Sequence, residues 1–445
     1  MFDQKFLRKI LKRLLFFFIF LMFTANADFK ADEFSLKNGM KVIMIEKKSV
    51  PIISLSVWYK CGSKCDMLSK SGAAHFLEHL ACENHKREFS NYLEEIGAEN
   101  NAFTFFNTIC FYEIFPKDCL EKVLSFESER MKSLEIEDKV FQNEKKAILE
   151  ERGMRVDADV QGRYEEIFLS NVFNRQIGGI EVIGWKHEIE SIEVEDLQSF
   201  YKKWITPNNA ILILVGDFEK KSAQKLIEKY FGIISPGDLP KISSLNDKES
   251  NKKLIEYRST ENGPSSSITY VLKVPFLSKN NLRKSLALSL ALEILGQPTS
   301  FTETILKQMS NIISAVNFSY TDSVYQFDIL GIIFHANSID NLDKVEIAWP
   351  YLKKKILANC ISESDLKKVK KRKLISLAYK KQDVQQIAEY FGWNLMSELS
   401  VKEILSLDDT IQSITVKECN DVLKEVFSTS PISVTKTLPK GYDRD

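Results

Sequence analysis

The segment Ala74-His75-Phe76-Leu77-Glu78-His79-Leu80 contains two of the five histidines of this 445-residue chain, four positions apart, with a glutamate between them. In a helix, which turns about 100° per residue, His75, Glu78 and His79 fall on one stripe. Side chains four positions apart on a helix are neighbours, so both imidazoles can reach one metal ion. The segment therefore predicts a helix that presents a metal site.

The opposite face of the same helix is apolar, and we expect it to pack against a sheet. Glu78 lies between the two imidazoles in angle, so it can accept a proton from a water held by the metal without being a ligand itself. The alternative is a solvated polar face, the common interpretation of a lone histidine, whereas a histidine pair with its glutamate favours a metal. The apolar face consists of Ala73, Phe76, Leu77, Leu80 and Ala81.

Two histidines leave a zinc site one protein ligand short, because catalytic zinc commonly has three, and two histidines with a glutamate are a frequent set. In segment 140–152, Glu144 and Glu151 fall on the apolar side of a helical wheel, whereas Glu150 points away. Two carboxylates on a buried face are costly unless a cation compensates them. We therefore expect Glu151 to be the third ligand and Glu144 to support the site. Without the histidine pair, acids on a helix edge that reach solvent or basic side chains would be the preferred interpretation.

The whole chain follows one order twice, runs of strands and then runs of helices. This order predicts an α+β fold of two tandem domains, each an antiparallel β-sheet packed with α-helices. The polar stretch from Ser235 to Lys253 contains two prolines and a glycine and indicates a linker. The expected divisions are a signal peptide at 1–27, a first domain at 28–235, a linker at 236–253, a second domain at 254–437 and a tail at 438–445.

Periodicity of the apolar residues places the individual elements. Helices are expected from about Ser71, between Leu120 and Phe173, and from the strands of the second half up to Phe427. Apolar runs rich in β-branched and aromatic residues are expected to form the strands. The clearest elements are strands 40–46, 52–59, 102–105, 108–115, 210–215, 267–274 and 433–436, two strands within 312–336, and a helix at 282–295.

The first 27 residues have the order of a secretory signal. Basic residues up to Arg13 precede the apolar run Leu14 to Phe23, and Ala25-Asn26-Ala27 follows it. Because this run is too short for a normal membrane span, we expect an exported, periplasmic protein. The alternative is an uncleaved signal that anchors the chain in the inner membrane.

Charge and cysteine content argue against other classes of protein. The 61 basic and 61 acidic residues cancel, which disfavours a nucleic-acid-binding surface. The seven cysteines include no Cys-x-x-Cys pair, so neither a thiolate zinc site nor a disulfide framework is expected. Cys61 and Cys65 could be bridged in an oxidising compartment, although scattered small apolar residues explain them better.

These motifs together resemble the pitrilysin/insulinase family of inverted zinc metallopeptidases, and most closely the short bacterial relatives of the mitochondrial processing peptidase. In that family a His-x-x-Glu-His helix is followed, about one helical hairpin later, by two glutamates seven positions apart. Glu144 and Glu151 match that order and spacing. The resemblance implies one zinc ion per chain bound by His75, His79 and Glu151, with Glu144 supporting the ligands and Glu78 as general base.

The resemblance covers nearly all of residues 34–437 and implies a catalytic first domain and an inactive homologous second domain. The two domains would close like a clam over an unfolded peptide. Asn101 and Ala102 match the Asn-Ala step of the family's edge strand, which contacts the substrate in relatives. Ile183-Gly184-Trp185 is similar to a later family signature. The loop after His79 is shorter than in relatives, which we interpret as a deletion.

One departure concerns the second domain. Complete relatives carry an arginine and a tyrosine, seven positions apart, that help to bind substrate and stabilise the transition state. The matching positions here are Lys307 and Ser314. In bacterial two-protein members the missing pair belongs to a catalytically inactive partner subunit. The resemblance therefore implies a heterodimer with such a subunit.

The function expected from these features is a zinc-dependent endopeptidase that hydrolyses peptides or unfolded polypeptides. The main alternative is a non-catalytic structural or interaction subunit of a processing-peptidase-like heterodimer. The intact set of His75, Glu78, His79 and Glu151 argues against it, since an inactive subunit has no need of these residues. A solute-binding protein has little support beyond the secretory signal.

Overall fold

The computed structural model describes residues 30–83, 86–172, 181–240, 255–258, 266–275, 278–297, 301–321 and 328–438. The expected signal peptide, most of the expected linker and residues 439–445 of the expected tail lie outside these ranges. Among the described helices, none combines the length and the apolar character that a membrane crossing requires.

The first half of the chain forms a six-stranded sheet in the order β1-β2-β6-β3-β5-β4, here called sheet 1. Its neighbouring strands are antiparallel, except that β2 and β6 are parallel. Strand β4 is therefore a terminal strand of the sheet. The strands are β1 (Ala31–Ser35), β2 (Lys41–Glu46), β3 (Ile52–Tyr59), β4 (Glu99–Thr104), β5 (Ile109–Pro116) and β6 (Ala210–Gly216).

Helices of the first half cover one face of sheet 1, and their apolar side chains form one continuous core with it. The catalytic candidates lie on two of these helices, α2 and α5. The helical segments are η1 (Ser63–Cys65), α2 (Ala73–Glu83), η2 (Lys86–Ser90), α3 (Asn91–Glu95), η3 (Lys117–Cys119), α4 (Leu120–Lys132), α5 (Asp138–Arg152), η4 (Gly153–Asp157), α6 (Val160–Val172), α7 (Lys186–Ser191), α8 (Val194–Trp204), η6 (Pro207–Asn209) and α9 (Lys220–Phe231).

The second half forms sheet 2, a five-stranded sheet in the order β7-β11-β8-β10-β9. Only β7 and β11 are parallel to each other among its neighbouring strands. The strands are β7 (Ile255–Arg258), β8 (Ser267–Val274), β9 (Ile313–Thr321), β10 (Asp328–Ala336) and β11 (Ser433–Leu438). The helical segments are α10 (Leu282–Leu295), α11 (Phe301–Gln308), η7 (Ile339–Asn341), η8 (Asp343–Ile347), α12 (Ala348–Leu357), α13 (Glu363–Lys380), α14 (Val384–Met396), α15 (Val401–Leu405), α16 (Leu407–Ser413) and α17 (Val416–Ser428).

The expected α+β class with two sheet-and-helix units is confirmed, and each sheet adds one parallel pair to the expected antiparallel strands. Strand β8 and helix α10 have the predicted bounds. The edge strand β4 begins at Glu99, three residues before its predicted start, and ends at Thr104. Strand β1, at Ala31–Ser35, was not among the predicted strands. Cys61 and Cys65 are both buried and have free thiols.

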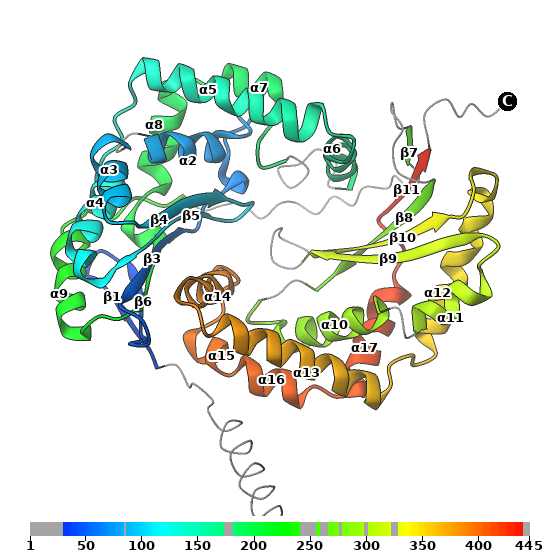
Figure 1. Cartoon of the computed structure of the whole chain (residues 1–445). Helices are drawn as coiled ribbons and strands as arrows, with labels where there is room; N and C mark the ends of the chain where they lie inside the picture. Colours follow the sequence, from blue (N-terminus) through cyan, green and yellow to red (C-terminus); the bar gives the residue numbers. More distant parts are fainter. Residues whose placement is uncertain are drawn as a thin grey trace, which may run out of the picture.

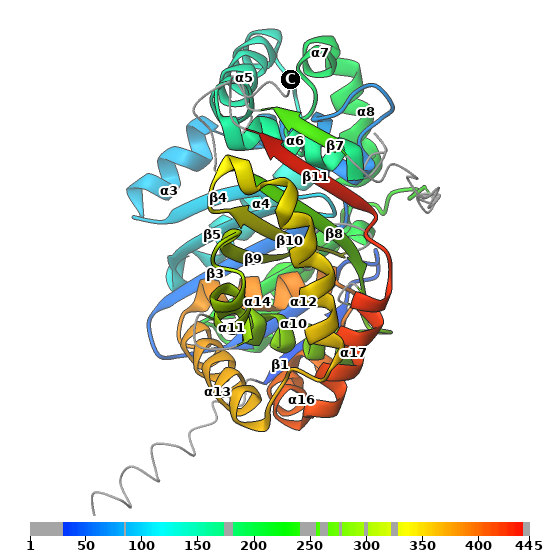
Figure 2. The same ribbon diagram turned by 90° about the vertical axis from the view of Figure 1, so that its right-hand side faces the viewer.

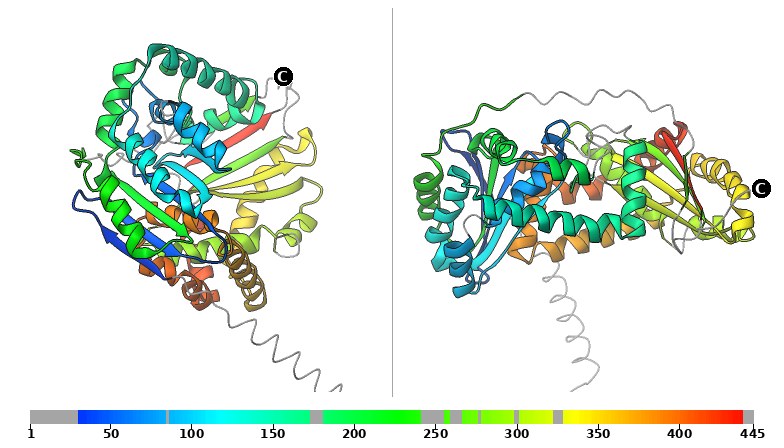
Figure 3. Two further views of the ribbon diagram at one scale, coloured as in Figure 1. Left: turned by 60° about the vertical axis from the view of Figure 1, so that its left-hand side comes forward. Right: turned by 90° about the horizontal axis from the view of Figure 1, so that it is seen from above.

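Each sheet is covered on its second face by a helix from the other half of the chain. Helix α14 packs on sheet 1, where Phe391 shares a buried cluster with Ile43 and Ile213. Helix α6 packs on sheet 2, where Leu169 and Val172 meet strands β8 and β10. Figures 1 and 2 show α14 beside sheet 1 and α6 beside sheet 2. Seen from above, α5 runs towards the second half and leads to α6 (Figure 3).

Burial on both faces explains the composition of the central strands. Strand β6 reads Ala-Ile-Leu-Ile-Leu-Val-Gly and is buried along its whole length. Its side chains alternate between the core under the helices of the first half and the cluster under α14. A strand covered on both faces has no position at which a polar side chain would reach water.

Gly392 marks the closest approach between α14 and sheet 1. A Cβ atom at this position would lie 2.1 Å from Cε2 of Trp58. Overpacking a dense contact typically costs about 1–3 kcal/mol, which exceeds the roughly 1 kcal/mol that alanine gains over glycine in helix propensity. We predict that Gly392→Ala lowers the free energy of unfolding by up to about 2 kcal/mol, the overpacking cost less the gain in helix propensity, as measured by urea denaturation.

The matched control is Gly331→Ala on β10, where the added methyl group would meet Cβ of Ser319 at an ordinary 3.6 Å. This variant should be much less destabilised than Gly392→Ala. Equal effects of the two substitutions would contradict a close contact between α14 and Trp58.

A buried charge cluster lies between sheet 1 and α4. Nη1 of Arg130 lies 2.7 Å from Oε1 of Glu127 and 3.4 Å from Oε1 of Glu113. The guanidinium also lies over the ring of Phe111, 4.5 Å from its centroid. One cation faces two carboxylates here. Burial, and next the neighbouring charge of Glu127, raise the pKa of Glu113 well above its ordinary value.

This shift has a defined sign for stability. Unfolded Glu113 loses its proton near pH 4.5, whereas the folded protein retains it to higher pH. The stabilising contribution is therefore complete below pH 4.5 and is lost as the pH rises towards the folded pKa, by at most about 1.4 kcal/mol per pH unit. Glutamine imitates the protonated form at every pH. We predict that the stability of Glu113→Gln relative to the parent protein increases as the pH rises above about 4.5, measured by urea denaturation. Parallel stability curves would contradict the shift.

Candidate metal centre

Helix α2 forms because its apolar face fits the core of the first half. Phe76, Leu77 and Leu80 are almost completely buried, and the ring of Phe76 stacks on Phe141 of α5 at 5.1 Å. This contact fixes α2 against α5. At its N-terminal end, the carboxylate of Asp66 accepts hydrogen bonds from the backbone N–H groups of Gly72 and Ala74, both at 2.8 Å. A carboxylate there satisfies donors that a helix leaves unpaired and compensates the helix dipole.

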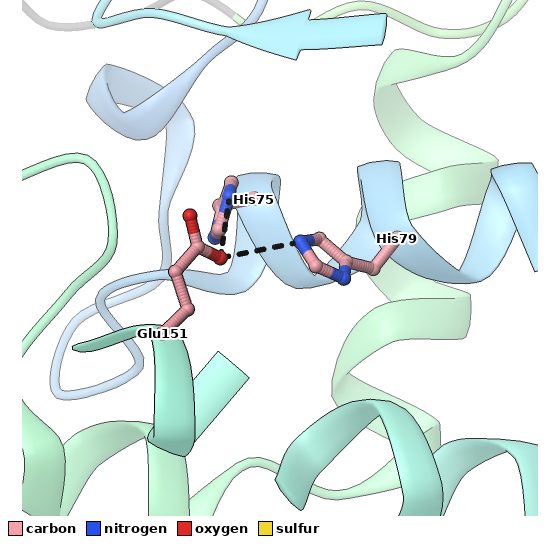
Figure 4. Close-up of side chains that lie close together, drawn as sticks. All are labelled: His75, His79 and Glu151. Atoms are coloured by element: carbon pink, nitrogen blue, oxygen red, sulfur yellow. Dashed lines mark ion pairs between the residues drawn. The ribbon is translucent and has the colours of Figure 1, made fainter. Parts of the chain in front are cut away.

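Three side chains from α2 and α5 converge on one point (Figure 4). Oε2 of Glu151 lies 3.8 Å from Nε2 of His75 and 3.6 Å from Nε2 of His79. One donor atom from each of the three residues lies within 4.8 Å of the others. The structure therefore brings the three predicted ligands together.

This donor set fits a zinc ion. In tetrahedral zinc sites with ligand distances of about 2.0–2.1 Å, the ligand atoms lie about 3.4 Å apart. Movement of the three side chains towards one another would bring their donor atoms to this separation. Nδ1 of His79 lies 3.0 Å from Oε2 of Glu144. A carboxylate in that position accepts a hydrogen bond from the Nδ1–H group, so that Nε2 is unprotonated and free to bind a metal. Nδ1 of His75 is buried and has no hydrogen-bond partner in the described part of the chain.

The titration behaviour of these groups follows from burial and from their contacts. Burial, and then the charge of His79, lower the pKa of His75 to about 4. Burial also opposes protonation of His79, but its contacts with Glu151 and Glu144 outweigh it and raise the pKa of that ring. The hydrogen bond from His79 is the main reason that the pKa of Glu151 is lowered. His75 is thus held neutral, the state in which imidazole binds metals.

Glu78 lies beside the three ligands and is held by strand β4. Its Oε2 accepts a hydrogen bond of 2.5 Å from the hydroxyl of Thr104. Burial is the largest cause of the raised pKa of Glu78, and the Thr104 hydrogen bond opposes it. A carboxylate with a raised pKa is a better proton acceptor near neutral pH.

Two residues at this site were missed by sequence analysis. Thr104 reaches Glu78 from the end of β4, a contact across 26 positions that no local pattern indicates. Arg155, in the π-helical turn η4, lies 2.7 Å from Oε1 of Glu151. Its spacing of four from Glu151 on a helix was an available signal.

The other predicted positions lie apart from the three ligands. Asn101 and Ala102 are on the terminal strand β4, where the side chain of Asn101 accepts a hydrogen bond of 2.8 Å from the backbone N–H of Ala102. Lys307 is exposed at the end of α11, and Ser314 is exposed on β9. Of the remaining histidines, His187 is on α7, His335 is on β10 and His85 lies outside the described residues.

Comparison with known proteins assigns the class. The two-sheet fold is shared with solved structures of proteases. A family model described as insulinase (peptidase family M16) matches residues 41–183, and one described as the peptidase M16 inactive domain matches residues 191–373. The chain belongs to the insulinase family, peptidase family M16, and the resemblance inferred from its sequence is confirmed.

Individual relatives agree with this assignment. The zinc protease PqqE of Helicobacter pylori is 29% identical over 232 residues, which cover 49% of this chain and 52% of the relative. The mitochondrial-processing peptidase subunit beta of Caenorhabditis elegans is 24% identical over 90% of this chain and 88% of its own length. For PqqE and the other highest-scoring curated relatives, the chain spans about half of the relative's length.

Solved structures show the same fold. A protease from Helicobacter pylori superposes with a TM-score of 0.80 at 22% identity, and covers 92% of this chain and 99% of that chain. The periplasmic protease PqqL of Escherichia coli superposes with a TM-score of 0.74 at 19% identity, over 92% of this chain but 47% of that chain. At these identities the likeness establishes the fold alone.

The hydrogen bond between Glu144 and His79 gives a test of the metal centre. Removing a carboxylate that orients a metal-binding histidine typically weakens metal affinity about 10–100-fold. We predict a loss of this size for Glu144→Gln, measured as the zinc dissociation constant in competition with a chelating dye. Glu150→Gln is the matched control, because Glu150 is on the same helix and its side chain is exposed. Unchanged affinity in Glu144→Gln would contradict this role of Glu144.

Proposed function

We propose that this protein is a zinc-dependent endopeptidase that hydrolyses peptides or unfolded polypeptides, with one zinc ion per chain. The observation that carries the proposal is the convergence of His75, His79 and Glu151 within 4.8 Å, beside a half-buried glutamate, Glu78, that is not one of the three. Structural carboxylate–histidine pairs occur on many surfaces, but three such groups around one point favour a divalent cation.

The residues of the chain have distinct roles in this mechanism. His75, His79 and Glu151 would hold the ion, which when bound supplies a Lewis acid that polarises the peptide carbonyl and lowers the pKa of water. Glu78 acts as general base and takes the proton of the attacking water on its carboxylate. Its raised pKa allows it to return that proton to the leaving amine. Thr104 holds one oxygen of Glu78 and so orients the other.

The substrate is proposed to bind along β4. A terminal strand offers unpaired backbone groups to which an extended peptide can add as another strand. Asn101 and Ala102 are on that strand. Thr104, two positions after Ala102 on the same strand, contacts Glu78. Recognition through the backbone favours flexible peptides and gives weak selectivity for side chains.

A catalytically inactive homologous subunit is the proposed partner. Lys307 and Ser314 stand where complete relatives have an arginine and a tyrosine, so the partner would supply that pair. We further propose domains at 28–235 and 254–437 and export to the periplasm, with an uncleaved signal as the alternative to a free protein. The related mitochondrial-processing peptidase subunit beta is, by its name, one subunit of an assembly.

A non-catalytic subunit of such a heterodimer is the second candidate function. The match of residues 191–373 to a model described as an inactive domain, together with the replaced pair, favours it. Zinc content discriminates between the two functions, because a structural subunit does not need the ion.

The decisive variant is Glu78→Gln. Glutamine is nearly isosteric and does not touch the three proposed ligands, so zinc should bind with unchanged affinity. Because a general base typically contributes about 10²–10⁴-fold to the rate, we predict a loss of peptide hydrolysis of that size. The assay uses the purified protein, alone and with a candidate partner, on a quenched fluorescent peptide. Equal turnover by the parent protein and the variant would remove Glu78 from the mechanism.

A further inference from the structure

Arg152 follows Glu151 directly and is buried, with 4% of its side chain exposed. Its Nη1 donates a hydrogen bond of 2.6 Å to the backbone carbonyl of Gly184. Its Nη2 lies 2.7 Å from Oε1 of Glu166 and 3.4 Å from Oδ1 of Asp157. One guanidinium thus joins the end of α5 to a distant loop and to α6.

The loop that Arg152 reaches is the one that fixes the start of α2. Gly184 and Gly72 both have φ of +87°, and a Cβ atom on either would lie 2.4 Å from a backbone oxygen of the other segment. The backbone N–H of Trp185 donates to the hydroxyl of Ser71 at 2.9 Å. The carboxylate of Glu188 accepts from the backbone N–H of Ser71 at 2.8 Å. Since α2 begins at Ala73, this crossing sets the position of the helix that carries both histidines.

Glu166, the other partner of Arg152, belongs to the helix that lies on sheet 2. Three residues further along α6, Leu169 joins the apolar cluster with Val271 and Ile329. The hydroxyl of Tyr164, on the same helix, lies 3.3 Å from Oγ1 of Thr269. The end of α5 is therefore held between the start of α2 on one side and a helix anchored to the second half on the other.

We propose that Arg152 is a positioning residue that sets the place of Glu151 relative to the two histidines of α2. This inference rests on the proposed function, because it presumes that the three side chains bind zinc. Within its own helical turn, the carboxylate of Glu151 contacts Arg155, and that side chain is largely exposed. Arg155 is therefore a weak restraint on the position of Glu151. Metal affinity depends on bringing three donors to one point, so loosening the end of α5 should weaken zinc binding before it affects the fold.

The test compares variants of the full-length protein in two measurements, the zinc dissociation constant and the thermal midpoint of the metal-free protein. Arg152→Met should weaken zinc binding about tenfold or more. Arg152→Lys should bind zinc more tightly than Arg152→Met but less tightly than the parent protein. Lysine retains the positive charge, but it lacks the planar guanidinium that contacts Gly184 and Glu166 at the same time. Glu166→Gln keeps a hydrogen-bond acceptor and should weaken zinc binding in the same direction by less. It also serves if Arg152→Met does not fold.

The matched control is Lys436→Met in sheet 2. Lys436 is also buried, with Nζ 2.5 Å from Glu346 and 3.4 Å from Asp343, but it lies on β11, apart from the three proposed ligands. The Lys436→Met variant should have a lower thermal midpoint than the parent protein and an unchanged zinc affinity. Zinc binding by Arg152→Met and Glu166→Gln as tight as that of the parent protein would overturn the proposal. A parent protein that binds zinc without cleaving peptides would instead refute the proposed function alone, and one that binds no zinc would refute both.

Discussion

The site depends on one constraint: a carboxylate at the end of one helix must lie against two imidazoles carried by another. Neither α2 nor α5 can satisfy it alone, because His75 and Glu151 are on different helices, 76 positions apart in the sequence. The stacking of Phe76 on Phe141 holds the two helices together in their N-terminal halves, and the backbone crossing at Gly72 and Gly184 holds the start of α2. The polar groups of the site are thus positioned largely by apolar and backbone contacts that have no chemistry of their own.

This arrangement stores unfavourable electrostatics that a cation would relieve. Glu144, Glu151 and the buried, neutral His75 belong to this cluster, and a third glutamate, Glu78, lies beside them and contacts strand β4. The raised pKa of His79 and the exposed guanidinium of Arg155 partly compensate the carboxylates. Functional sites commonly contain unfavourable interactions of this kind, which the surrounding scaffold offsets.

The sequence predicted the parts of the structure that are governed by short-range periodicity. The stripe of His75, Glu78 and His79 and the inward placement of Glu144 and Glu151 follow from helical spacing alone, and the structure brings four of these five side chains into direct polar contact with one another. Strand β8 and helix α10 were predicted residue for residue because their apolar runs are bounded by polar, proline or glycine positions.

Other features could not be predicted because they arise from contacts between distant segments. No pattern around Thr104 indicates that its hydroxyl meets Glu78, and no pattern around Arg152 indicates a carbonyl 32 positions away. The parallel pairs β2 with β6 and β7 with β11 join strands far apart in the chain. The hydropathy pattern of a strand does not indicate which distant strand it will pair with. Strand β1 was not predicted for a simpler reason: its residues are half-buried or exposed, and two of them are acidic.

The reciprocal placement of α6 and α14 has a consequence for how this chain can evolve and be engineered. In each half, the helix that covers the second face of the sheet comes from the other half, so a half produced by itself would expose an apolar sheet face to water. Such halves are not autonomous modules: they cannot be exchanged between proteins singly, and a backbone break between them would leave two fragments still wrapped around each other.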